Sequence, residues 1–244
     1  MQQDMTGRVA LITGAGNGIG RATARQMAAR GAIVAVNDLK SEFVDAVVNE
    51  ITASGGKAFG VVQNISSREG IAAAVQQARD HVGRFDILVN NAAWVRYQAV
   101  PDVQPETLDR MLDVGFKSVI WGIQAAVAAM DPERGGSIVN VASTAALRST
   151  LNSLVYSGIK AGVLGLTRAA AAELGVRRIR VNAVCPSAVP TEGTPRNRDA
   201  SRDALRVART PLGRMGNVED IARSICFLAS DEAEFMTAQA LVVD

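Results

Sequence analysis

The amino-acid sequence predicts an α/β protein, a doubly wound domain built around a mainly parallel, seven-stranded sheet. Short β-branched runs alternate with longer Ala-rich stretches along the whole chain. The short runs are nearly uniformly apolar, which is typical of strands that helices cover on both faces of a parallel sheet. No internal repeat, linker or break in composition is visible, so residues 1–244 are expected to form one domain.

The predicted strands and helices follow one another in turn, with a single long segment left over. Strands are expected at Arg8–Thr13, Ala32–Asn37, Lys57–Val62, Asp86–Asn90, Ser137–Val141, Ile179–Val184 and Ala240–Val243. Helices are expected at Gly18–Arg30, Ser41–Ser54, Ser67–Val82, Pro105–Met130, Leu154–Leu174 and Val218–Ala229. The segment Pro186–Arg209 has little apolar periodicity and is interpreted as a substrate loop. Ligands of such folds bind at the carboxyl ends of the strands, so the candidate site lies there.

The composition argues against several classes of protein. With 26 basic and 24 acidic residues the net charge is only +2, which does not favour nucleic-acid binding. Cys185 and Cys226 are the only cysteines, no secretory signal is apparent, and the apolar runs look too short for a membrane span. We therefore predict a cytoplasmic protein without membrane association. His81 is the sole histidine and lies in a polar stretch, so neither a metal site nor a Ser-His-Asp triad is expected.

A glycine-rich loop, residues 13–20, follows the first predicted strand. Its spacing is G-x-x-x-G-x-G, formed by Gly14, Gly18 and Gly20, and not G-x-G-x-x-G. Glycines let the backbone turn tightly and approach a pyrophosphate, which the free N–H groups of the next helix attract. The loop could be only a structural turn, but its position in a βαβ unit favours dinucleotide binding.

Asp38 ends the second predicted strand, where a carboxylate can accept hydrogen bonds from both hydroxyls of the adenosine ribose. The same charge would repel the 2′-phosphate of NADP, and Asn17 leaves the glycine loop without a basic residue to pair with that phosphate. NAD is therefore the predicted cofactor. Asp38 could instead cap the helix that begins near Ser41, and the two roles can coexist.

Tyr156 and Lys160 lie four residues apart on one predicted helix and project from the same face. The ordinary pKa of tyrosine is near 10, so a base that works near neutrality must have its pKa lowered. The ammonium of Lys160, together with the positive charge of oxidised nicotinamide, is expected to lower it. Tyr156 would then exchange a proton with an alcohol or ketone, and Lys160 would also hold the nicotinamide ribose. Ser143, after the fifth strand, would bind the substrate oxygen.

Together these motifs resemble the short-chain dehydrogenase/reductase family, from Arg8 to Asp244. The resemblance implies a Rossmann-type fold, with Ser143, Tyr156 and Lys160 as the catalytic residues. It also implies that Val189 and Thr191 contact the nicotinamide carboxamide. The residues expected to hold the cofactor are Gly14, Asn17, Gly18, Ile19, Gly20, Asp38, Asn64, Ile65, Asn91, Ala92, Ala93, Tyr156, Lys160, Pro186, Val189 and Thr191.

The sequence also departs from the family pattern. Gly115 stands where the family has an asparagine that holds a water for proton relay to the lysine, which bears on the rate of that relay. Asn64 replaces an aspartate that commonly faces the adenine. Ser187 and Ala238 each replace a family glycine, and the Gly-Gly tail that the family places after Asp244 is missing from the sequence. The cofactor prediction does not depend on these positions.

The predicted function is NAD-dependent interconversion of a secondary alcohol and a ketone on a small, cyclic or otherwise hydrophobic substrate. Trp94, Tyr97 and Leu147 are expected to line the substrate pocket, although the two aromatic residues could equally belong to the core. One alternative is a 3-oxoacyl-carrier-protein reductase, against which Asp38 weighs because reductive biosynthesis generally draws on NADPH. Another is a dinucleotide-binding protein with little catalysis. The family resemblance implies a homotetramer or a dimer.

Overall fold

The computed structural model describes residues 4–148, 150–192 and 200–244. All strands belong to one parallel sheet with the order β3-β2-β1-β4-β5-β6-β7. They are β1 (Val9–Ile12), β2 (Ile33–Asp38), β3 (Lys57–Val62), β4 (Ile87–Asn90), β5 (Gly136–Val141), β6 (Ile179–Pro186) and β7 (Ala240–Val243). The predicted seven-stranded, Rossmann-type α/β fold is confirmed, and the sheet is parallel throughout.

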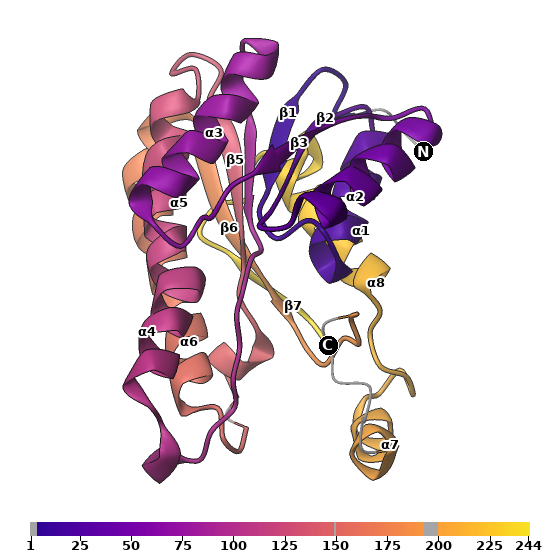
Figure 1. Ribbon diagram of the computed structural model, residues 1–244, viewed down its shortest axis with the longest axis vertical. Coiled ribbons are helices and arrows are strands. Elements are labelled where there is room, and N and C mark those ends of the chain that lie inside the picture. The colour runs from indigo at the N-terminus through magenta and orange to yellow at the C-terminus, as the bar shows by residue number, and fades with distance from the viewer. Residues whose placement is uncertain (1–3, 149, 193–199) are drawn as a thin grey trace.

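Helices cover both faces of the sheet (Figure 1). One face carries α1 (Gly18–Ala29), α2 (Ser41–Ala53) and α8 (Val218–Ala229), and the other carries α3 (Arg68–Val82), α4 (Pro105–Leu112), α5 (Ser118–Ala129) and α6 (Leu154–Leu174). Successive side chains of a strand point to opposite faces. In β1, Ala10 and Ile12 pack with α1, α2 and α8, whereas Val9 and Leu11 pack with α3, α5 and α6. This two-sided burial explains why the central strands are mostly apolar on both faces.

The predicted helix Pro105–Met130 is interrupted by a π-helical segment, Asp113–Lys117, between α4 and α5. Gly115 lies in this segment, and a Cβ there would be 3.3 Å from Cγ2 of Ile159 on α6. The Ser118 hydroxyl donates to the Val114 carbonyl at 2.7 Å and so satisfies an acceptor in the irregular turn. The predicted long helix is confirmed as the continuous stretch Pro105–Ala129, and the π-helical segment inside it was not predicted because the apolar pattern continues through it.

The expectation that every apolar run is too short to span a membrane was wrong for the stretch Pro105–Ala129. Of the helices in the part of the chain that the structure describes, it is the one long and apolar enough to cross a membrane by length and composition alone, with a mean hydropathy of 1.2. Val119 and Ala126 of α5 are nevertheless buried, and Ala126 packs in the same cluster as residues of β1 and α3. One side of the stretch therefore packs into the core, and 33% of its most apolar 18-residue window is buried.

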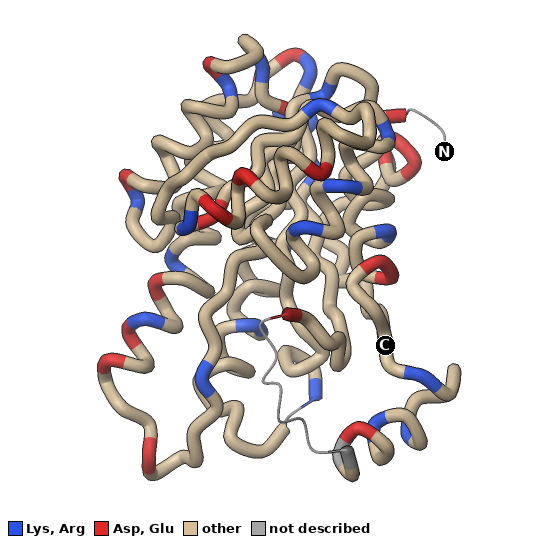
Figure 2. Tube along the Cα trace, turned by 45° about the vertical axis from the view of Figure 1, so that its right-hand side comes forward, with Lys and Arg blue, Asp and Glu red and all other residues tan. Residues whose placement is uncertain are grey.

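A helix, α7 (Ala200–Arg209), lies in the segment that was predicted to be a loop, and residues 193–199 lie outside the described residues. It projects from the sheet layers on the side where β6 and β7 end (Figure 1). Figure 2 shows acidic and basic residues interspersed along the outer helices, α7 included. Asp203 and Arg206 pair at 3.2 Å one turn apart, a local interaction that supports a helix with few buried apolar residues. The prediction that this part of the segment is a loop was wrong, because the helix is short and mostly polar and the apolar residues on its one side were overlooked.

Ala238 has a φ of 62°, in the left-handed region that favours glycine, which agrees with the family glycine at this position. We expect Ala238→Gly to raise the free energy of unfolding by about 1 kcal/mol, because this strain exceeds the extra freedom that glycine gives the unfolded chain. Chemical denaturation measures the change. Ala240→Gly in β7, the matched control, should lower stability, and a loss of stability in both variants would contradict the interpretation of Ala238.

Candidate active site

A cleft of about 370 Å³ opens where the central strands end, and loops that follow β1, β2, β3 and β4 form most of its walls. The sheet order changes direction here, because β1 lies between β2 and β4. Ligands of doubly wound sheets bind at this switch point. The lining residues are Gly14, Asn17, Gly18, Ile19, Asn37, Asp38, Leu39, Gln63, Asn64, Ile65, Asn91, Ala92, Ala93, Trp94, Arg110, Val114 and Thr191.

The glycine loop after β1 is held by the loop after β4. Asn91 donates from Nδ2 to the carbonyls of Thr13 at 2.8 Å and Gly14 at 3.1 Å, and its backbone N–H reaches Oγ1 of Thr13 at 3.0 Å. A Cβ on Gly20 would lie 2.3 Å from the Gly14 carbonyl oxygen, so no side chain fits there. Gly14 and Gly18 have φ values of 62° and 54°. The loop therefore brings backbone N–H groups to the edge of the cleft, as a phosphate site requires.

The carboxylate of Asp38 joins the end of β2 to the glycine loop. Oδ2 accepts a hydrogen bond from the Gly16 N–H at 3.1 Å, and Oδ1 accepts one from the Leu39 N–H at 2.7 Å. Helix α2 has Lys40 as its N-cap without a side-chain capping bond, so the alternative role of Asp38 as a cap for α2 is wrong. A carboxylate has about four acceptor positions, which leaves acceptors for ligand hydroxyls.

Tyr156 and Lys160 lie on α6, close to Ser143, which follows β5. The Lys160 Nζ donates to the Val141 carbonyl at 2.6 Å and lies 5.9 Å from the centroid of the Tyr156 ring. The Ser143 hydroxyl accepts a hydrogen bond from the Ala145 N–H at 3.1 Å. None of the three catalytic candidates lines the cleft itself. Ile159, on the same helix as Tyr156 and Lys160, lies close to Gly115 in the π-helical segment, whose Val114 forms part of the cleft wall.

Burial governs the protonation of this group. It raises the pKa of Tyr156 to about 12, and the hydrogen bond with Ser143 acts in the opposite direction. Burial also lowers the pKa of Lys160 to about 8, since its side chain is almost fully enclosed. Among the chain's own groups, burial therefore outweighs any lowering of the Tyr156 pKa by Lys160, and the expected lowering by Lys160 together with oxidised nicotinamide stays a prediction. The chain's own groups hold Tyr156 as a neutral phenol at physiological pH.

The aromatic residues predicted to line the substrate pocket do not belong to the core. Trp94 lines the cleft and packs on the Arg110 guanidinium, whose Cζ is 4.3 Å from the ring centroid. The Tyr97 ring meets the Tyr156 ring edge to face, with 5.7 Å between the centroids. Tyr97 and Leu147 are both more than half exposed. The core interpretation of the two aromatic residues is thus wrong, and Tyr97 lies beside the proton-transfer candidate.

Several cleft residues were not predicted. Leu39 and Gln63 follow β2 and β3, so the rule that ligands bind where strands end could have identified them. Arg110 and Val114 reach the cleft from α4 and the π-helical segment, and no local motif indicates this. Of the predicted cofactor residues, Gly20, Pro186, Val189, Tyr156 and Lys160 do not line the cleft.

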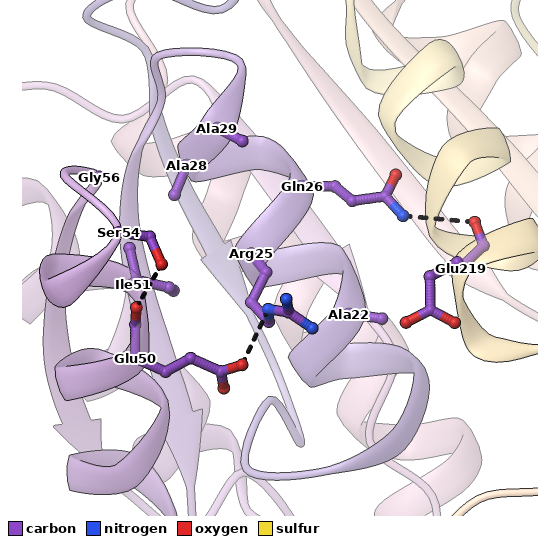
Figure 3. Close-up of a pocket in the computed structure, with 10 residues that line it drawn as sticks. All are labelled: Ala22, Arg25, Gln26, Ala28, Ala29, Glu50, Ile51, Ser54, Gly56 and Glu219. Atoms are coloured by element: carbon purple, nitrogen blue, oxygen red, sulfur yellow. Dashed lines mark hydrogen bonds and ion pairs between the residues drawn. The ribbon is translucent and has the colours of Figure 1, made fainter. Parts of the chain in front are cut away.

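A second hollow of about 220 Å³ lies between α1, α2 and α8 (Figure 3). Its polar groups bind one another. Arg25 pairs with Glu50 at 3.0 Å, Ser54 donates to the Glu50 carbonyl at 2.9 Å, and Gln26 donates to the Glu219 carbonyl at 3.3 Å. The hollow lies away from the strand ends, so we assign no function to it.

Comparison with known proteins places this site in a family. The family model described as enoyl-(acyl carrier protein) reductase matches residues 14–244, nearly the whole chain. The chain belongs to the short-chain dehydrogenase/reductase family. It is 38% identical over 240 residues to the 3-oxoacyl-acyl-carrier-protein reductase FabG of Thermotoga maritima, an alignment that covers 98% of this chain and 97% of that protein.

Other members of the family are similarly close. Subunit BbsD of a hydroxy(phenyl)methylsuccinyl-CoA dehydrogenase from Thauera aromatica is 39% identical over 236 residues, covering 97% of this chain and 94% of BbsD. A solved 7α-hydroxysteroid dehydrogenase, complexed with NADH and 7-oxo glycochenodeoxycholic acid, has a TM-score of 0.95 at 32% identity, covering 99% and 94% of the two chains. This short-chain dehydrogenase/reductase is therefore an oxidoreductase of a family that uses NAD(P).

Proposed function

We propose that this short-chain dehydrogenase/reductase is NAD-dependent and interconverts a secondary alcohol and a ketone, with Tyr156 transferring the proton. The observation that carries the proposal is Tyr156, half-buried on α6 with the buried Lys160 ammonium one turn away, together with a cleft at the strand ends that is suited to a dinucleotide. The exposed apolar surface of Leu147 and the ring of Tyr97 next to Tyr156 support a small, cyclic or otherwise hydrophobic substrate.

The choice of NAD depends on Asp38. Its free acceptor positions suit the two adenosine ribose hydroxyls, and its negative charge disfavours a 2′-phosphate at the same place. We assign the pyrophosphate to the N–H groups of Gly18 and Ile19, and the nicotinamide ribose to Lys160. A solved relative with the same fold is complexed with NADH, which supports NAD as the cofactor.

The chain's own residues divide the proton chemistry between them. When bound, the nicotinamide supplies or accepts a hydride. The Ser143 hydroxyl donates a hydrogen bond to the substrate oxygen and stabilises negative charge that develops there. In ketone reduction Tyr156 donates its phenolic proton to that oxygen, and in alcohol oxidation its phenolate accepts the proton. Burial favours the phenol, which is the form of Tyr156 that ketone reduction uses.

The pH dependence should differ between the two directions. Reduction needs the phenol, the form that is present below the pKa of Tyr156, so its rate should stay nearly constant from pH 6 to about 7 and decline above that only as Lys160, whose pKa is about 8, loses its charge. Oxidation needs the phenolate, so its rate should rise with pH over the same range. Initial rates of both reactions in a buffer series measure this. A reduction rate that falls steeply between pH 6 and 7, below the pKa of both Lys160 and Tyr156, would contradict the proton role of Tyr156.

A panel of secondary alcohols and ketones, assayed with both cofactors, tests the function. We expect turnover of hydrophobic or cyclic substrates with NAD(H). Relatives such as FabG are named as 3-oxoacyl-acyl-carrier-protein reductases, which favours a second candidate function. An enzyme of that kind would reduce 3-oxoacyl thioesters on a carrier protein with NADPH. Tight cofactor binding without turnover of any substrate would instead indicate the other alternative, a dinucleotide-binding protein with little catalytic activity.

Assembly and location are further proposals. The family resemblance leads us to propose a homotetramer, or a dimer, located in the cytoplasm. Analytical ultracentrifugation of the purified chain measures the assembly directly.

A further inference from the structure

The carboxylate of Glu192 occupies the N-terminus of α1, at the edge of the cleft. Its Oε2 accepts a hydrogen bond from the Gly18 N–H at 2.9 Å, across a separation of 174 residues in the sequence. Its Oε1 lies 3.6 Å from Nη1 of Arg21 in the first turn of the same helix. Thr191, the neighbouring residue, approaches Gly18 so closely that a Cβ there would be 3.1 Å from its Cγ2. Glu192 thus accepts the hydrogen bond of a backbone N–H group that the glycine loop could otherwise donate to an anionic ligand.

No other described acidic side chain takes this position. The first turn of α1 contains no acidic residue, and its N-cap, Asn17, makes no side-chain capping bond. The start of a helix carries a partial positive charge and free N–H groups, and a carboxylate there is stabilising. Glu192 provides this charge from the segment that follows β6.

We propose that Glu192 is an internal competitor for the pyrophosphate site. The inference rests on the proposed function, in which the N–H groups of Gly18 and Ile19 bind the pyrophosphate of NAD. A carboxylate and a pyrophosphate cannot accept the same hydrogen bond from Gly18, and their negative charges repel at this distance. Cofactor binding therefore requires the Glu192 side chain to leave Gly18. The contact lowers the affinity for the cofactor and favours its release.

Three ligands and two variants test the proposal. NADH and ADP-ribose contain the pyrophosphate, whereas adenosine does not, so calorimetric titration with each separates the phosphate site from the adenosine site. Glu192→Gln keeps the size of the side chain and removes its charge. Glu219→Gln is the matched control, because Glu219 also lies in the first turn of a helix, α8, but lines the second hollow and not the cleft.

We expect Glu192→Gln to lower the Kd of NADH and of ADP-ribose by roughly two- to fivefold, in line with the usual strength of an anion at a helix N-terminus. The Kd of adenosine should not change, and Glu219→Gln should match the wild type for all three ligands. Thermal melting of both variants checks that they are folded. Because the carboxylate stabilises the start of α1, we expect the melting temperature of Glu192→Gln to fall slightly.

Two results would overturn the proposal. If Glu192→Gln binds NADH with unchanged affinity, the contact does not compete, and if it binds NADH more weakly, Glu192 helps to hold the cofactor. Both results leave the proposed function intact, since the wild type still binds NADH. A wild-type chain that binds neither NADH nor NADPH would overturn the proposed function together with this inference.

Discussion

Tyr156→Phe should reduce turnover by roughly 10²- to 10⁴-fold in both directions, the usual contribution of a positioned general acid or base. The substitution removes the phenolic oxygen and keeps the ring, so the packing of α6 should be preserved. The Kd of NADH should change little, because Lys160 and the glycine loop remain. Steady-state kinetics with the best substrate of the panel, together with NADH titration, measure the two effects separately.

Tyr97→Phe is the matched control for this experiment, since Tyr97 is the only other tyrosine and its ring meets that of Tyr156. It should alter KM more than kcat, because the proposal places Tyr97 against the substrate and not at the reacting oxygen. A kcat that is lowered equally by the two substitutions would refute the assignment of proton transfer to Tyr156.

Gly20→Ala should weaken NADH binding by at least roughly tenfold and destabilise the fold by about 1–3 kcal/mol. The added Cβ would lie 2.3 Å from the Gly14 carbonyl oxygen and 2.9 Å from Cα of Ala15, so the backbone of the glycine loop must move. Moving it displaces the N–H groups that the proposal assigns to the pyrophosphate. Thermal melting and NADH titration measure the two losses.

Gly165→Ala in α6 is the control for this substitution. No atom of the described structure lies within 4 Å of a Cβ at that position, and alanine favours a helix interior over glycine by about 1 kcal/mol. It should therefore maintain or raise stability and bind NADH as the wild type does. If Gly20→Ala also bound NADH normally, the glycine loop would not be the phosphate site.

The fold could be predicted because its signals are local. Each strand is a short apolar run, and α1 follows directly after the glycine loop, so periodicity and turn chemistry identify both. The same reliance on local signals explains why the π-helical segment Asp113–Lys117 and the helix α7 were not predicted. The π-helical segment does not end the apolar pattern of the long helix, and α7 is short and mostly polar, so the apolar residues on one side of it were overlooked.

The properties of the site depend on contacts between distant residues. The sequence spacing places Tyr156 and Lys160 on one helix face, but it contains no information on how deeply they are buried. Among the chain's own groups, burial outweighs any lowering of the Tyr156 pKa by Lys160. The contact of Glu192 with Gly18 joins segments 174 residues apart, and no motif marks it. Residue types could therefore be predicted, whereas their protonation and long-range partners required the fold.

Fluorescence titration of the wild-type chain with NADH and with NADPH tests most directly whether the cleft beside Asp38 is a site for NAD. The account predicts that NADH binds at least roughly tenfold more tightly, because the carboxylate accepts hydrogen bonds from the ribose hydroxyls and repels a 2′-phosphate. Equal affinity for the two cofactors would contradict it.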